Sequence, residues 1–249
     1  MAFLHEQPRP HEPLLRVPAT PIWLILFLAL AHAGRVFSPP DISERFLINY
    51  AFIPARYSHE FLASHGLNPG SWLDRAVPFI SYIFIHADWT HLAINSVWLL
   101  AFGAIVARRF GPFRFVGFFL LCGIAGAGTH LAFNWESPAP VIGASAAISG
   151  LMAAGFRMMS ALPGFDSMAV HTGAYGPPPL APLFSTRILL WSAVWAGVNV
   201  FAGMTGLGAG DGVRLIAWQA HLGGYLAGLV LVGLFDRLAP PVSVLHPSE

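Results

Sequence analysis

The sequence predicts an all-α membrane protein, a bundle of six transmembrane helices with a long, partly helical outer loop between the first and second helices. The composition is 55% hydrophobic and 10% charged, with a mean hydropathy of +0.62, whereas soluble domains carry about 25% charged residues. Six apolar segments each approach the roughly 20 residues that a helix needs to cross a bilayer. The net charge of +1 gives no reason to expect a nucleic-acid partner.

The predicted helices follow one another along a single domain. Their expected ranges are 21–37, 91–107, 113–133, 142–160, 184–204 and 218–235. We assign residues 21–237 to one transmembrane domain, with cytoplasmic tails at residues 1–20 and 238–249. The first segment has an alternative interpretation as a secretory signal peptide, because arginines precede its apolar stretch and a small-residue site follows at residues 31–33.

The arginines indicate how the helices are oriented. Arginines in short loops favour the cytoplasmic side of a membrane. If the helices alternate in direction, one side collects the larger group of arginines, namely Arg9, Arg16, Arg108, Arg109, Arg114, Arg157, Arg187 and Arg237. We therefore expect both termini in the cytoplasm, and the compact chain favours a bacterial inner membrane.

Two connections are long enough to have structure or function of their own. Residues 38–90 contain a helical pattern at 58–65 and an apolar stretch at 79–85. We expect this connection to lie partly helical in the outer interface, where Trp72 and Trp89 are possible anchors. The connection at 163–182 is rich in proline and glycine and is expected to be irregular.

Ser145 is the first candidate for chemistry. It follows Gly143 at the beginning of the helix predicted for 142–160. The first amides of a helix lack hydrogen-bond partners and form the positive end of its dipole, and both features suit a developing oxyanion. The alternative is that Ser145 only caps the helix or packs as a small residue against another helix.

His221 is the second candidate. Its spacing to Gly224 and Gly228 puts all three residues on one face of the predicted helix 218–235. The glycines allow a close approach to a second smooth helix, and Ser145 is the obvious neighbour. Imidazole is the natural base for a serine hydroxyl near neutral pH. The alternative is a histidine that is merely hydrogen-bonded to a neighbouring helix.

The third candidate cluster lies where the second predicted helix begins. His91 and Asn95 share one helical face, and two such donors side by side can stabilise a negative oxygen. His86 precedes the helix and is expected to fix the loop rather than react. Asp88 or Thr90 can cap this helix whatever the function.

The remaining ionisable and reactive groups are weaker candidates. His130 and Glu136 flank the end of a predicted helix, and Asp211 and Arg214 lie in a glycine-rich loop. Cys122 is the only cysteine and is expected to be inert packing. We find no carboxylate at a spacing that would orient His221, so the residues favour a Ser–His dyad over a triad.

Together, these motifs resemble the rhomboid intramembrane serine proteases. The similarity covers roughly residues 79–228 and has the family's order and spacing. It rests on Gly143-Ala144-Ser145, on His221 with Gly224 and Gly228, and on His86, His91 and Asn95.

The resemblance implies both a fold and an activity. It implies a six-helix bundle with an outward-opening, water-filled cavity, in which Ser145 is the nucleophile and His221 the general base. It implies that Asn95, His91 and the Ser145 amide form the oxyanion hole, and that the helix with Trp191 is a lateral gate. The implied substrates are transmembrane segments of other proteins, with no metal or cofactor.

Three positions depart from the family pattern. Ala146 stands where a glycine usually follows the nucleophile, and Ser149 stands where an aromatic ring often packs on the histidine. Val77-Pro78 replaces a Trp-Arg pair of the outer loop. Ala146 and Ser149 favour the main alternative, an inactive rhomboid-like protein that binds transmembrane segments without cutting them.

Two other classes of function fit less well. Intramembrane histidines can ligate a metal or haem. No two of the relevant histidines lie four residues apart on one helix; they are His86, His91, His130 and His221. A transporter would be expected to show broken helices at matching places in two halves, and the sequence shows none.

Overall fold

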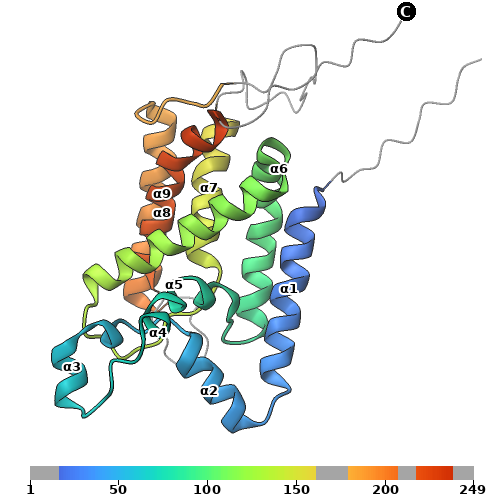
Figure 1. Ribbon diagram of the computed structural model, residues 1–249. Coiled ribbons are helices and arrows are strands. Elements are labelled where there is room, and N and C mark those ends of the chain that lie inside the picture. The colour runs from blue at the N-terminus through green and yellow to red at the C-terminus, as the bar shows by residue number, and fades with distance from the viewer. Residues whose placement is uncertain (1–16, 161–178, 207–216, 238–249) are drawn as a thin grey trace, which may run out of the picture.

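The computed structural model describes residues 17–160, 179–206 and 217–237, and helices dominate these residues (Figure 1). Residues 1–16 of the predicted N-terminal tail, the whole predicted C-terminal tail and most of the connection at 163–182 lie outside the described residues. Residues 19 and 20, expected in the N-terminal tail, belong to the first helix instead. Within them, the extended pairing is one isolated antiparallel bridge, between Phe52 and Val141. The predicted all-helical class is therefore confirmed.

Four of the described helices are long and apolar enough to cross a membrane. They are α1 (Ala19–Val36), α6 (Trp89–Phe133), α8 (Thr186–Thr205) and α9 (Trp218–Arg237). A fifth helix, α7 (Ser145–Met159), has 15 residues and lies in the centre of the bundle. The count of six membrane crossings stays a prediction.

The helix α6 is two helices joined by a kink. Gly111 has φ 71° and ψ 175°, and Pro112 follows it. A straight helix of 45 residues would measure about 68 Å, roughly twice the thickness of the bilayer core. The chain instead turns back, so that the first arm lies beside α1 and the second crosses the bundle obliquely (Figure 1). The loop expected at residues 108–112 is reduced to this kink.

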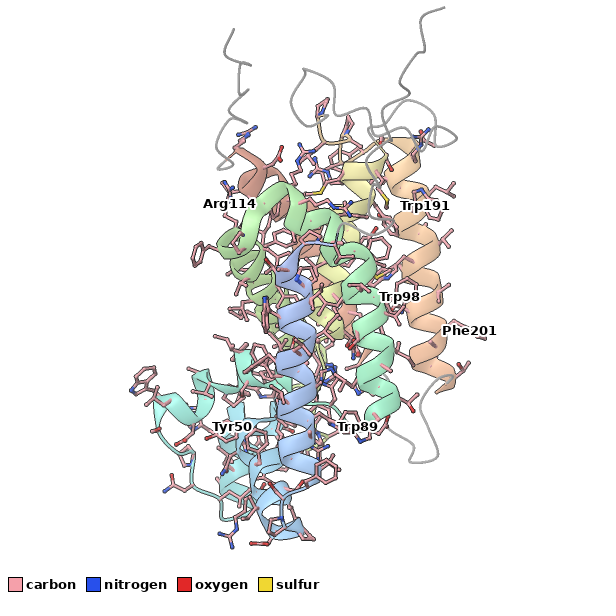
Figure 2. The ribbon with its side chains drawn as sticks, turned by 90° about the vertical axis from the view of Figure 1, so that its right-hand side faces the viewer. Tyr50, Trp89, Trp98, Arg114, Trp191 and Phe201 are labelled. Carbon is pink, nitrogen blue, oxygen red and sulfur yellow. The ribbon has the colours of Figure 1, made fainter. Side chains whose placement is uncertain are left out.

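The outer faces of the long helices are apolar. On α8, Phe201 points away from the bundle (Figure 2) and is 60% exposed. On α1, Trp23 and Leu30 are exposed to a similar extent. Apolar patches of this kind are rare on soluble monomers and match a lipid environment. The described structure is therefore that of a membrane protein.

The centre of the bundle is held together by small residues. The helix α7 packs against α6 and α9, and most of its side chains are buried. A methyl group added at Gly228 would lie 2.3 Å from the backbone oxygen of Gly150, and one at Gly224 would lie 2.0 Å from that of Ala146. These helices can approach so closely only because the side chains between them are absent.

Short helices fill the connection between α1 and α6. They are α2 (Pro40–Tyr50), η1 (Pro54–Tyr57), α3 (His59–Ser64), α4 (Trp72–Ala76), α5 (Pro78–Ser81) and η2 (Tyr82–Phe84). The helical pattern expected at 58–65 corresponds to α3. The apolar stretch expected at 79–85 corresponds to α5 and η2. That this connection lies in the outer interface stays a prediction.

This connection fixes the start of α7. Phe52 and Val141 exchange two backbone hydrogen bonds, of 3.1 and 2.8 Å. The amide of Gly143 donates to the carbonyl of Tyr82 at 2.9 Å, and the Tyr82 hydroxyl donates to the carbonyl of Gly123 at 2.7 Å. Because these bonds hold residues 141–143 outside the helix, α7 begins at Ser145 and the predicted start at residue 142 is wrong.

We predict that Gly228→Ala will destabilise the protein by about 1–3 kcal/mol, because the new methyl group must push α9 away from Gly150. The measurement is the thermal unfolding midpoint of the purified protein in detergent. Gly128→Ala is the matched control, since a methyl group there meets nothing within 4 Å. Equal midpoints for both variants would contradict the close packing described above.

Candidate active site

Ser145 is the first residue of α7 and is half-buried. The preceding residue, Ala144, has no side chain that could cap the helix. The amides of the first turn therefore remain available as donors beside the serine hydroxyl. Gly143 has φ +118°, a backbone conformation that favours glycine, so the turn into the helix depends on that residue.

The structure brings Ser145 and His221 together. The Ser145 Oγ and the His221 Nε2 lie 2.6 Å apart, although 76 residues separate them in the sequence. His221 lies in the first turns of α9, and the close approach of α9 to α7 carries the ring to the serine. This is the spacing of a hydrogen bond between a nucleophile and its base.

A residue that the sequence analysis missed also contacts His221. The Asn199 Oδ1 lies 2.8 Å from the His221 Nδ1, and the Asn199 Nδ2 donates to the carbonyl of Trp195 at 3.0 Å. Asn199 comes from α8, so three helices meet at the imidazole. The signal in the sequence was an amide within an apolar segment, where a polar group is costly unless it has a partner.

His91 and Asn95 lie on the opposite side of Ser145, near the start of α6. The edge of the His91 ring packs against Gly143, where a methyl group would lie 2.8 Å from its Nε2. The Ala87 amide donates to the His91 Nδ1 at 3.4 Å, which leaves the hydrogen on Nε2. The Asn95 Nδ2 donates one hydrogen to the His91 carbonyl at 3.1 Å, and its second hydrogen can serve the cavity.

His86 is buried behind His91 and does not line the cavity. Burial, together with the neighbouring His91 and His32, lowers the pKa of His86 to about 3, so its ring is neutral. Its carbonyl accepts a hydrogen bond of 2.7 Å from the Arg35 Nη2 at the end of α1. The His86 backbone thus links the start of α6 to the end of α1.

The candidate site opens into a cavity of about 720 Å³ between the first arm of α6, α7, α8 and α9. Its polar lining consists of Asp88, Thr90, His91, Asn95, Ser145, Ser149, Asn199 and His221. The rest is apolar and aromatic, and Figure 2 shows Trp98 and Trp191 on the two neighbouring helices that border it. The remaining apolar lining residues are Ile94, Ile148, Met152, Phe156, Val194, Trp195 and Val198.

The structure shows where two residues that depart from the family pattern lie, Ala146 and Ser149. The Ala146 methyl does not line the cavity; it lies against Gly126, where a second methyl would come within 2.7 Å of it. The Ser149 hydroxyl donates to the Ser145 carbonyl at 2.8 Å. Ser149 therefore neither packs a ring on His221 nor donates to it.

The weaker candidates lie elsewhere. Glu136 accepts a hydrogen bond of 2.8 Å from Ser58, and the Asn134 Nδ2 lies 3.4 Å from the His130 Nδ1. Asp211 and Arg214 lie outside the described residues. Among the residues that the structure describes, no three His, Cys, Asp or Glu side chains gather as metal ligands.

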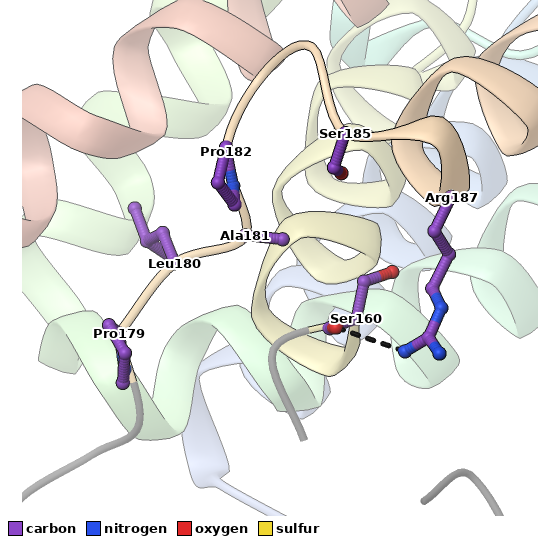
Figure 3. A pocket seen from close by; sticks show the side chains of 7 residues that line it. All are labelled: Ser160, Pro179, Leu180, Ala181, Pro182, Ser185 and Arg187. Atoms are coloured by element: carbon purple, nitrogen blue, oxygen red, sulfur yellow. Dashed lines mark hydrogen bonds between the residues drawn. The ribbon is translucent and has the colours of Figure 1, made fainter. Parts of the chain in front are cut away.

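A second hollow, of about 400 Å³, lies at the other end of α7 (Figure 3). It is bordered by residues 179–182, and Arg187 donates to the carbonyl of Ser160 at 3.1 Å there. Among the described residues that border it, no serine lies beside a histidine, whereas Ser145 and His221 meet in the larger cavity.

Comparisons with known proteins point to one family. A family model described as a Rhomboid domain matches residues 73–237. The chain is 29% identical over 162 residues to "Rhomboid-like protein 11, chloroplastic" of Arabidopsis thaliana. The aligned stretch covers 64% of this chain and 52% of the relative. It is 36% identical over 85 residues to "Rhomboid protease GluP" of Bacillus subtilis (strain 168). This aligned stretch covers 34% of this chain and 15% of the relative.

The matched part thus spans about half of the plant relative and a smaller share of GluP. The family model covers more than half of this chain, from α4 to the end of α9. The apolar helices α6, α8 and α9, the small-residue contacts of α7 and the candidate site fall within the matched range, whereas α1 precedes it. This chain belongs to the rhomboid family.

Proposed function

We propose that this protein is an intramembrane serine endopeptidase that hydrolyses peptide bonds in or near transmembrane segments of other proteins. The observation that carries the proposal is the 2.6 Å contact between Ser145 and His221 inside a cavity bordered by apolar helices. A serine and a histidine are costly in such a place unless they serve a function.

In the first step, the Ser145 hydroxyl attacks the carbonyl carbon of the substrate while His221 Nε2 accepts its proton. The imidazolium then gives this proton to the leaving amine, and an acyl-enzyme forms. In the second step, water attacks the ester while His221 accepts a proton from it. His221 then returns this proton to the Ser145 oxygen as the ester bond breaks, which releases the new carboxyl end and restores the serine. The reaction uses no metal or cofactor.

The negative oxygen that forms in each step needs donors. We assign this role to the His91 Nε2, the Asn95 Nδ2 and the amide of Ser145. The His91 ring packs against Gly143, two residues before the nucleophile. Donors held in place before the reaction stabilise the transition state without having to reorganise.

We further propose that the described chain crosses the membrane six times. The two arms of α6 count separately, and α7 is the sixth crossing. A helix of 15 residues spans about 22 Å, less than the roughly 30 Å of a bilayer core. Because α7 is enclosed by α6 and α9, its ends need not reach the surface, and Ser145 would lie below the outer edge of the membrane.

A substrate helix must unwind before its backbone can reach Ser145, because its peptide bonds are hydrogen-bonded internally. Glycine costs about 1 kcal/mol and proline about 3 kcal/mol in a helix interior. We therefore propose that substrates are selected by the local instability of their transmembrane helix.

The orientation and the kind of membrane also remain proposals. An even number of crossings puts both termini on one side, and the arginines favour the cytoplasm. A bacterial inner membrane stays a prediction, since one relative carries a chloroplast name and the other comes from a bacterium.

The alternative is a rhomboid-like protein that binds transmembrane segments without cutting them. Ala146 and Ser149 favoured it in the sequence, but Ala146 lies outside the cavity and the Ser149 hydroxyl is bonded to its own helix. Reaction with a fluorophosphonate, which labels activated serines, separates the two functions.

We predict that Ser145→Ala will abolish both fluorophosphonate labelling and cleavage of a co-reconstituted transmembrane substrate, because the nucleophile is gone. The fold should be retained, since alanine fits wherever serine does. The measurements are gel-based labelling, substrate cleavage in proteoliposomes and the thermal unfolding midpoint. Cleavage by a stable Ser145→Ala variant would refute the assignment.

We predict that Asn95→Ala will lower kcat by about 10²–10³, the usual effect of removing one oxyanion donor. Asn134→Ala is the matched control, because Asn134 makes the same amide-to-carbonyl bond, to His130, outside the cavity. It should leave kcat unchanged in the same proteoliposome assay. If both variants lose activity equally, Asn95 has no special role.

A further inference from the structure

The contact between Asn199 and His221 is a polar contact between two apolar helices, α8 and α9. Both side chains are polar and partly buried, and their atoms meet at 2.8 Å between α8 and α9. The Asn199 side chain also faces the cavity that contains Ser145. A polar contact at the back of the proposed base affects how that base is held.

The orientation of the Asn199 amide follows from its second bond. Its Nδ2 donates to the carbonyl of Trp195, one turn earlier on α8. A carbonyl can only accept, so the nitrogen of the amide must face Trp195 and the oxygen must face His221. The network assigns this orientation without ambiguity.

The protonation of His221 follows in turn. Because Asn199 Oδ1 can only accept, the His221 Nδ1 must carry a hydrogen. In a neutral imidazole the other nitrogen is then bare. The bare Nε2 faces the Ser145 hydroxyl at 2.6 Å and can take its proton. A chain of three bonds, starting at the Trp195 carbonyl, thus presents the base in the form that the proposed reaction needs.

Nothing else among the described residues supplies this support. Ser149 is bonded to the Ser145 carbonyl, and the nearest carboxylate that lines the cavity, Asp88, accepts from the His91 amide instead. The Nδ1 of His221 has Asn199 as its hydrogen-bond partner in the described part of the chain.

We propose that Asn199 is a positioning residue, which holds the His221 ring in place with the hydrogen on Nδ1. This inference rests on the proposed protease function and adds a third member, from a third helix, to the Ser145–His221 pair. Since α8 borders the cavity and carries Asn199, the base is correctly held only while α8 lies against α9.

The chain provides a control for general loosening of α8. Besides Asn199–His221, α8 and α9 share a second polar contact, in which the Ser192 Oγ lies 2.9 Å from the Tyr225 Oη. Ser192→Ala removes a contact between the same two helices without touching the imidazole. A merely structural role for Asn199 predicts the same effect for both substitutions.

The experiment compares Asn199→Leu, Asn199→Ala, Asn199→Asp and Ser192→Ala in the full-length protein. Leucine and alanine remove the acceptor, whereas aspartate keeps an oxygen in the same position. The readouts are the rate of fluorophosphonate labelling of Ser145 in detergent, which needs no transmembrane substrate, and kcat and KM in proteoliposomes. The unfolding midpoint of each variant reports its stability.

We expect Asn199→Leu and Asn199→Ala to lower both the labelling rate and kcat by about 10- to 100-fold, part of the usual contribution of a general base. KM should change by less than about twofold, because the bond matters in the transition state. Asn199→Asp should label faster than either, and Ser192→Ala should label as the wild type does.

The inference would be overturned if Asn199→Leu and Asn199→Ala both label at the wild-type rate. It would also be overturned if Ser192→Ala loses as much labelling rate as they do, or if Asn199→Asp labels no faster than Asn199→Ala. If either Asn199→Leu or Asn199→Ala fails to fold, the other variant still tests the inference. A wild-type protein that neither labels nor cleaves would refute the proposed function itself. If the wild type labels and Ser145→Ala does not, the proposed function stands and the Asn199 variants test the inference alone.

Discussion

The hydrogen bond between Ser145 and His221 depends on how closely the backbones of α7 and α9 approach each other. At Gly224 and Gly228 the two helices are so near that one added methyl group would overlap a backbone oxygen of the other. Larger side chains would separate the helices by more than the reach of a hydrogen bond. The small residues between these helices are therefore a condition for the site as well as for the fold.

The connection between α1 and α6 contributes the second condition. Through Phe52 and Tyr82 it holds residues 141–143 outside the helix, so that α7 begins at Ser145 itself. The hydroxyl then stands beside amides that have no partner in the helix. Gly143 gives room to the His91 ring. The proposed nucleophile and base and the two proposed donor side chains thus come from three helices. Close backbone packing and the hydrogen bonds of the connection hold these helices in place.

The cavity combines features that rarely occur together. Ser145, His221 and other polar side chains line one part of it, and the remaining lining is apolar or aromatic. A transmembrane segment would find an apolar surface there, while water is needed only at Ser145. The third helix, α8, connects the two parts, because Trp191 and Trp195 line the apolar part and Asn199 contacts the base.

Much of this arrangement could be predicted from the sequence. The apolar segments predicted the helices to within a few residues, because the hydrophobic length of a membrane helix is written in consecutive residues. The spacing of His221, Gly224 and Gly228 predicted a smooth face carrying a base. The start of α7 was predicted three residues too early, since the bridge that holds Val141 is formed with Phe52, far away in the sequence.

Local pattern therefore determined the class of the fold, the helices and the residues that bear the chemistry. Tertiary structure alone decided which polar groups meet, because a contact between helices depends on rotation and distance that no single segment contains. Asn199 is the clearest case: as a lone amide in an apolar run it indicates no particular partner. Only the packing of α8 against α9 brings its oxygen to the imidazole of His221.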